Sequence, residues 1–214
     1  MKDLIARFVM RFIKAIKLPE VWRFKILYWG YRLLSPVHTR NAEWDFVLNY
    51  LPPLKDGQRV NVLDVGSTGS LLLFIIAKRG YDVTGADIRP YEERLLPNMS
   101  FFNCGINDIP LLDGTMDYIT VVSVIAHLGT SEYGSEEYIS GDQKAIKKFA
   151  KLLKQGRKLL ITTPTDIFIR RYWGKACKFR GYSYLQFKEL VEDYFDIQEC
   201  IERKGQLLAC CVRR

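Results

Sequence analysis

Small residues cluster in the stretch 63–70, which reads LDVGSTGS and follows a run of apolar, β-branched residues. Gly66 and Gly69 have no Cβ, so the backbone of this turn can approach a bound ligand closely. If a helix follows, its first N–H groups lack intrahelical partners and can bind the same ligand. A tight connection between a strand and a helix also favours glycine. The turn alone therefore indicates either a ligand-binding loop or an ordinary connection.

An acidic residue, Asp87, ends the next apolar run along the chain. It follows Gly66 by about 20 residues, the separation at which nucleoside-binding folds place a carboxylate for the ribose hydroxyls. Pro90 lies nearby, which leaves open a second interpretation, that Asp87 is a helix N-cap. Together the turn and the acid predict a nucleoside site.

The glycine pattern indicates which nucleoside is bound. A dinucleotide site requires G-x-G-x-x-G, whose glycines serve the pyrophosphate and close helix packing. Counted from Gly66, the second and third glycine positions hold Thr68 and Leu71, which disfavours NAD. S-adenosylmethionine has no phosphate, and its amino-acid part needs only a close and polar loop.

The elements that must position these residues alternate between short apolar runs and helical patterns, which is typical of a parallel sheet covered on both faces. The predicted strands are 60–65, 82–87, a short one beginning at 101, 117–124, 158–163, 195–199 and 207–212. The predicted helices are 71–79, 142–153 and 184–194, the last with Leu185, Leu190 and Val191 facing inward. No helix separates the last two strands, so we expect an antiparallel hairpin at one edge.

From Val60 to the C-terminus the sequence resembles the class I, Rossmann-like S-adenosylmethionine-dependent methyltransferases. Five blocks carry the resemblance in the order typical of that family: VLDVGSTGS, DVTGADI, the stretch from Asn107 to Gly129, LLKQGRKLLITTP, and YSYLQFKELVEDYFDIQE. The resemblance implies an α/β fold, a three-layer sandwich around a mostly parallel seven-stranded sheet with an antiparallel C-terminal hairpin. It also implies S-adenosyl-L-methionine as cofactor and S-adenosylhomocysteine as product.

The resemblance also implies roles for single residues. Asp64 is the acidic residue of the first block, Asp87 holds the ribose and Ile88 lies against adenine. The implied cofactor-binding residues are Asp64, Gly66, Ser67, Gly69, Asp87, Ile88, Ile106, Asn107 and Ser123. Thr68 and Ser70 stand where the family often has glycine. Gly105 stands where many members have an acid for the adenine amino group, so that contact passes to Asn107, to Asp108 or to backbone near Ile106.

The implied reaction is transfer of a methyl group to an acceptor that the sequence does not identify. His127 follows the fourth predicted strand, and imidazole titrates near neutral pH, so His127 is our candidate catalytic base if the acceptor is a weak acid. A packing or capping histidine is the alternative. The N-P-P-Y signature of enzymes that methylate exocyclic base nitrogens is absent, which disfavours DNA base methylation.

Most of the net charge of +8 belongs to one segment. Residues 1–40 contain nine basic and two acidic residues, which gives +7. Residues 1–18 have the spacing of a basic amphipathic helix that ends before Pro19. Its apolar face is expected to pack on the domain as a lid or dimer contact, or to bind an anionic membrane peripherally. We therefore divide the chain into a helical N-terminal segment, 1–50, and a methyltransferase domain, 51–214.

Two segments, 130–141 and 165–181, are expected to shape the acceptor pocket, and basic residues alternate with aromatic ones in the second. This pattern favours an anionic acceptor such as a small molecule, a glycan or a lipid-linked saccharide. An RNA methyltransferase and a non-catalytic S-adenosylmethionine-binding module are the alternatives. The five cysteines show no C-x-x-C pair, so we expect free thiols in a reducing cytoplasm and no bound metal. Basic residues interrupt the N-terminal apolar stretch, and no other apolar run has the length of a membrane span, so we expect neither a secretory signal nor a membrane-spanning segment. The sequence does not fix the oligomeric state.

Overall fold

The computed structural model describes residues 39–91, 93–130, 140–172 and 179–214. The chain divides into two compact units, Met1–Ala42 and Glu43–Arg214, and the second contains the whole sheet. The predicted amphipathic helix of residues 1–18 lies outside the described residues. The boundary near residue 50 stays a prediction.

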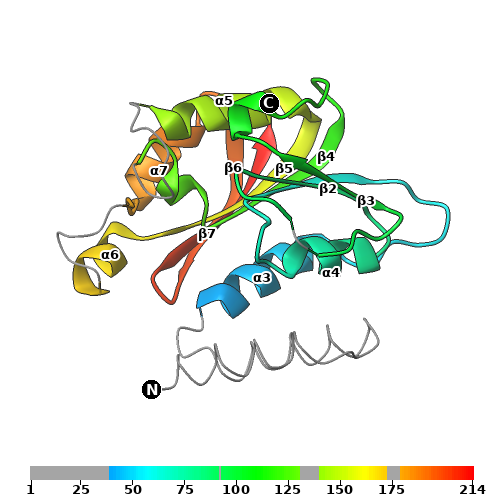
Figure 1. Cartoon of the computed structure of the whole chain (residues 1–214). Coiled ribbons are helices and arrows are strands. Elements are labelled where there is room, and N and C mark those ends of the chain that lie inside the picture. Colours follow the sequence, from blue (N-terminus) through cyan, green and yellow to red (C-terminus); the bar gives the residue numbers. More distant parts are fainter. Residues whose placement is uncertain (1–38, 92, 131–139, 173–178) are drawn as a thin grey trace, which may run out of the picture. The chain divides into compact units, whose positions relative to one another are not determined.

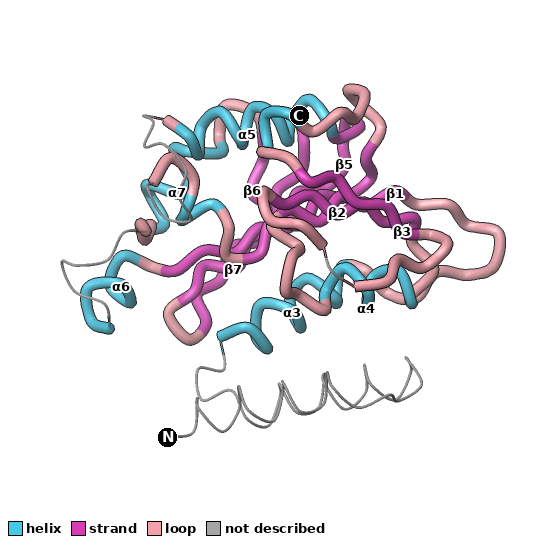
Figure 2. The backbone as a smooth tube through the Cα atoms, in the orientation of Figure 1, coloured by secondary structure: helices cyan, strands magenta, loops and turns pink. Residues whose placement is uncertain are grey.

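A seven-stranded sheet forms the centre of the second unit (Figures 1 and 2). Its strands are β1 (Asn61–Val65), β2 (Asp82–Asp87), β3 (Met99–Asn103), β4 (Met116–Val122), β5 (Leu153–Pro164), β6 (Phe195–Arg203) and β7 (Gln206–Arg213). The strand order is β3-β2-β1-β4-β5-β7-β6. All pairs from β3 to β5 are parallel, whereas β7 is antiparallel to both β5 and β6. This confirms the predicted sheet and its C-terminal hairpin.

Helices cover both faces of the sheet. The described helices are α3 (Thr39–Tyr50), α4 (Leu72–Lys78), α5 (Gly141–Leu152), α6 (Asp166–Tyr172) and α7 (Tyr184–Val191), with short 3-10 helices at Ile106–Asp108 and Ile125–His127. Figure 1 shows α4 below the sheet and α5 and α7 above it. The three-layer sandwich is therefore confirmed.

The central strands form where the sequence is mostly apolar and rich in β-branched residues, because parallel strands are buried on both faces. In β1, the four residues from Val62 to Val65 are all buried, and β4 is buried at six of its seven positions. The helix α5 instead buries one stripe, which includes Ile146 and Phe149. The fold prediction rested on the alternation of apolar runs, which form strands, with apolar stripes, which form helices.

Three local predictions were wrong. Leu185 is 67% exposed, because Phe187 and Val191, four residues apart, form the fully buried stripe of α7. The fourth strand ends at Val122, since Ser123 takes a left-handed backbone conformation with φ of 55°. The fifth strand begins at Leu153, directly after α5, and not at Lys158.

The described cysteines are Cys104, Cys200, Cys210 and Cys211, and all four are free thiols. Burial raises the pKa of each. Among the described residues, no group of histidine, cysteine and acidic side chains has the arrangement of a metal site. Within the same residues, no helix has the length and apolar character needed to cross a membrane.

Candidate functional site

The strand order reverses between β1 and β4, and in open α/β sheets ligands bind beyond the carboxyl ends of the strands at such a point. We call the ends of β1, β2 and β3 the first half of this edge. The ends of β4 and β5 form the second half. A hydrogen bond of 2.8 Å from the Gly66 N–H to the Ala86 carbonyl joins the turn after β1 to the end of β2.

Gly66 is required in the turn for two reasons. Its φ is +73°, a conformation that side chains disfavour, and a Cβ there would overlap the Val124 side chain. Gly69 also has a positive φ, +78°, but no described heavy atom lies within 4 Å of a Cβ built on it. The turn is therefore tight at Gly66 and open at Gly69.

The structure directs the two polar residues beside Gly66 toward neighbouring strands. Asp64 is 2% exposed and accepts a 2.6 Å hydrogen bond from the Thr120 hydroxyl, which ties β1 to β4. Ser67 is 1% exposed, and its Oγ lies 2.7 Å from the Cβ that Gly85 of β2 lacks. This Oγ has no hydrogen-bond partner among the described residues. The bare strand at Gly85 thus leaves room for Ser67.

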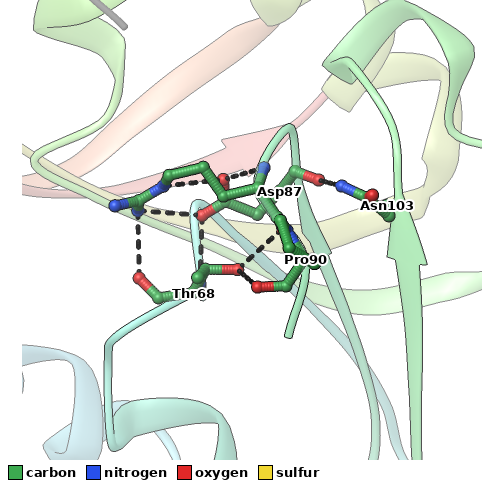
Figure 3. Close-up of polar contacts among 5 residues, drawn as sticks. Thr68, Asp87, Pro90 and Asn103 are labelled. Carbon is green, nitrogen blue, oxygen red and sulfur yellow. Dashed lines mark hydrogen bonds and ion pairs between the residues drawn. The ribbon is translucent and has the colours of Figure 1, made fainter. Parts of the chain in front are cut away.

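The Asp87 carboxylate lies directly beside the turn (Figure 3). It is nearly buried and accepts a hydrogen bond of 3.0 Å from the Thr68 N–H. The Arg89 side chain forms an ion pair with it. Asn103 and Cys104, at the end of β3, each donate a 3.0 Å hydrogen bond to the Asp87 main-chain carbonyl. The structure therefore brings the predicted turn and the predicted acid together.

Three further predicted residues lie on the same edge. Ile88 is 53% exposed although it is apolar, so it offers an apolar surface next to Asp87 in the sequence. Ile106 and Asn107 belong to the 3-10 helix that follows β3. Asn107 is exposed, whereas Ile106 is half-buried. Their roles toward adenine stay predictions.

The second half of the edge contains a buried carboxylate that sequence reasoning missed. Glu43 of α3 is 1% exposed, and the hydroxyls of Ser123 and Thr162 both donate to its Oε1. The Ser123 N–H also donates to the carbonyl and to the hydroxyl of Thr162, each at 3.0 Å. No local pattern around Glu43 indicates this position, because Thr162 lies more than 100 residues away in the sequence.

His127 lies apart from the first half, in the 3-10 helix after β4. Its ring is half-buried and packs against Phe179, with ring centroids 5.0 Å apart. Arg180 fixes the backbone on both sides of it, since its N–H donates to the Ala126 carbonyl and its guanidinium to the Leu128 carbonyl, both at 3.0 Å. The packing histidine and the catalytic base thus both remain consistent with its place.

A buried carboxylate orients Arg180 in turn. Asp142, at the start of α5, accepts 2.8 Å hydrogen bonds from the Arg180 guanidinium and from the Tyr182 hydroxyl. Burial and, after it, the Asp142 charge raise the pKa of Tyr182 above its ordinary value. Arg180 was predicted to belong to the basic acceptor loop, but its guanidinium binds Asp142 and the Leu128 carbonyl.

Comparisons with known proteins bear on the family to which the chain belongs. The chain matches a family described as "Methyltransferase domain" over residues 32–199. No curated protein has significant sequence similarity to it.

Three solved structures illustrate the similarity in fold. The N-methyltransferase NodS from Bradyrhizobium japonicum, in complex with S-adenosyl-L-homocysteine, has 17% identity and a TM-score of 0.63, covering 97% of this chain and 98% of its own. A 1,6-didemethyltoxoflavin-N1-methyltransferase from Burkholderia thailandensis, with bound 1,6-didemethyltoxoflavin and S-adenosylhomocysteine, has 12% identity and a TM-score of 0.63, covering 92% of this chain and 91% of its own. A TehB-like S-adenosylmethionine-dependent methyltransferase from Corynebacterium glutamicum has 15% identity and a TM-score of 0.59, covering 84% and 100%.

At these identities the structural likeness establishes the fold, whereas the family match covers most of the sequence. S-adenosylmethionine is the cofactor of the family, as the sequence predicts. The chain belongs to the methyltransferase-domain family and has the class I, Rossmann-like fold.

Proposed function

We propose that this chain is an S-adenosylmethionine-dependent methyltransferase whose acceptor is a small molecule that carries an anionic, glycan or lipid-linked group. One observation supports the donor part of this proposal most strongly. The tight turn at Gly66 and the buried Asp87 carboxylate lie side by side at the reversal of strand order. In doubly wound folds this is where the first strand–helix turn and an acid about 20 residues further on bind a nucleoside.

The residues of the first half fit this cofactor. The turn is bare at Gly69, where an amino-acid moiety needs room and backbone contacts. Asp87 offers a carboxylate that accepts hydrogen bonds from a 2′,3′-diol, and Ile88 exposes apolar surface beside it. Ser67 contributes a buried hydroxyl without a described partner. Asp64, bound to Thr120, is assigned to holding the turn between β1 and β4.

When bound, the cofactor supplies a methyl group on a sulfonium, which is already activated for in-line displacement. The chain must align an acceptor with that methyl group, and good alignment accounts for roughly 7–11 kcal/mol of rate acceleration. We assign the alignment to the second half of the edge, where Ser123 and Glu43 form a polar pair. The contact of Ser123 with the cofactor, expected from the sequence, stays a prediction. A base is needed only for a weakly acidic acceptor, and His127 is our candidate.

The acceptor class rests on the charge beside the second half. Arg170 and Arg171 end α6, and both are exposed. Arg171 lies over the Tyr172 ring, 5.5 Å from its centroid. Cations next to an exposed aromatic ring suit an anionic or sugar-containing acceptor. They also suit an RNA strand, so transfer to RNA is an outcome that the experiment must distinguish.

Calorimetry with S-adenosylhomocysteine tests the donor site. We expect the wild type to bind and Asp87→Asn, which keeps the shape of the side chain, to bind at least about tenfold more weakly. Arg94→Ala, an exposed change on the loop that follows, is the matched control. If the folded wild type takes up no ligand, the proposed donor site is wrong.

Incubation with a labelled methyl donor and fractionated cell extract tests the acceptor. We expect label in small molecules or lipids, and less of it with Arg170→Ala/Arg171→Ala. Label in RNA that is lost at high salt would identify the chain as an RNA methyltransferase. Ligand binding without transfer to any fraction would identify a non-catalytic module.

A further inference from the structure

The Arg89 side chain binds the Asp87 carboxylate, to which the proposed function assigns the ribose. Its Nε lies 3.3 Å from Asp87 Oδ1 and its Nη2 lies 3.2 Å from Oδ2. The Arg89 backbone N–H also donates to Oδ1, at 2.9 Å, and the Thr68 N–H donates to Oδ2, at 3.0 Å. The Asp87 side chain is 4% exposed, so it has little contact with solvent.

These four contacts fill the carboxylate. An ionised carboxylate has about four acceptor positions, two on each oxygen, and it can only accept. Two of the four positions are taken by backbone N–H groups, and two by the Arg89 guanidinium. A ribose diol brings two O–H donors, so it needs the two positions that the guanidinium holds.

The guanidinium is the part of Arg89 that must move when a diol binds. The Arg89 side chain is 48% exposed, so water reaches its charge. Its Nη2 also donates to the Thr68 carbonyl at 3.0 Å, and this hydrogen bond is given up with the ion pair. The Thr68 hydroxyl meanwhile donates to the carbonyls of Arg89 and Pro90, at 3.0 and 3.4 Å, and ties their backbone to the turn. The two backbone donors therefore stay on Asp87 while the side chain is exchanged for the diol.

We propose that Arg89 competes with the ribose diol for Asp87 and thereby lowers the affinity for the methyl donor and for its product. This inference rests on the proposed function. Arg89 acts as an internal competitor, because the charge-assisted contacts that stabilise the free protein must be given up when the nucleoside binds. The affinity is then set by the difference between two sets of hydrogen bonds to one carboxylate.

Two consequences distinguish this role from a purely structural ion pair. Removal of the guanidinium should strengthen binding, since the diol then meets a carboxylate with two open positions. Salt should also strengthen binding to the wild type, because screening weakens the half-exposed ion pair of the free protein. A variant without the cation should lack this response to salt.

The experiment is calorimetry with S-adenosylhomocysteine at low and high sodium chloride, on the folded full chain. We expect Arg89→Ala to bind about fivefold more tightly than wild type, the range that a partly exposed ion pair allows. Arg89→Lys, which keeps the charge but loses the planar fork, should lie between them. Arg94→Ala removes the same charge from the following loop and should bind like wild type.

The outcomes separate the two proposals. Equal or weaker binding by Arg89→Ala, with wild-type binding intact, overturns the competition and leaves the donor site standing. Tighter binding by both Arg89→Ala and Arg94→Ala would show a general charge effect and also overturns it. If neither wild type nor any variant binds, the proposed function itself fails and the competition fails with it.

Discussion

The two halves of the carboxyl edge are held together in different ways. In the first half, backbone N–H groups of one turn donate to the next strand: Gly66 to the Ala86 carbonyl and Thr68 to the Asp87 carboxylate. In the second half, side chains from distant segments meet, such as Glu43 with Thr162 and Asp142 with Arg180. Short-range spacing in the sequence therefore indicates the first half, whereas only the fold assembles the second.

Gly66→Ala should lower the stability of the first half more than any other single change proposed for either half. The new Cβ needs a disfavoured φ and overlaps Val124, which together cost about 3 kcal/mol. Gly69→Ala has a similar φ and open space, so we expect about 1 kcal/mol. Urea unfolding of both variants measures the difference. Equal losses of stability would mean that the close approach of Gly66 to Val124 does not explain the need for glycine.

Asp142→Ala should follow, and it tests the second half. It removes the acceptor of both Arg180 and Tyr182 in a nearly buried place, which costs about 2–3 kcal/mol. Affinity for S-adenosylhomocysteine should stay within about twofold of wild type, because both of these partners lie away from the first half. Asp196→Ala, which loses an exposed pair with Arg214, is the control and should change stability by about 0.5 kcal/mol or less. A loss of affinity in Asp142→Ala would show that the two halves are energetically coupled.

Thr162→Val should have a smaller effect in the same half. It removes one hydroxyl donor to Glu43 and one of the two acceptors of the Ser123 N–H, whose bond to the Thr162 carbonyl stays, so we expect a cost of about 1–2 kcal/mol. Thr84→Val loses only an exposed contact with Ser100 and should be nearly neutral. Thermal unfolding compares the pair. Equal stability of the two variants would show that Glu43 does not depend on Thr162.

Tyr81→Phe should have the smallest effect, and it tests the opposite edge of the sheet. Burial raises the pKa of Tyr81 to about 12, whereas an unfolded tyrosine ionises near pH 10. The folded state thus holds the proton more tightly, so this contribution is complete below pH 10 and is lost as the pH rises to 12. Urea unfolding between pH 10 and pH 12 should show a smaller loss of stability for Tyr81→Phe than for the wild type. An equal loss in both would mean that ionisation of Tyr81 does not contribute to it.

The sequence predicted the sheet and the first half of the site because both depend on local patterns. Gly66 and Asp87 have a fixed separation when one strand, one helix and a second strand lie between them. Apolar runs and helical stripes likewise located every strand of the sheet, within a few residues at most ends.

The rest could not be predicted from local patterns for physical reasons. Which of Leu185 and Phe187 faces inward depends on where α7 begins, and the capping box of Ser183 and Gln186 sets that start. The competition at Asp87 depends on the conformation of the Arg89 side chain after β2 ends. The buried place of Glu43 depends on Ser123 and Thr162, which are far from it in the sequence. Each of these requires the three-dimensional structure.

Two buried cysteines with raised pKa allow the opening of the β6–β7 hairpin to be measured. Alkylating reagents attack thiolates, and at neutral pH Cys210 and Cys211 of β7 are protonated and shielded from solvent. They react only when β7 separates from its neighbours, so their labelling rate measures how often that edge opens. The labelling of these two thiols thus reports the local opening of β7 in the unaltered sequence.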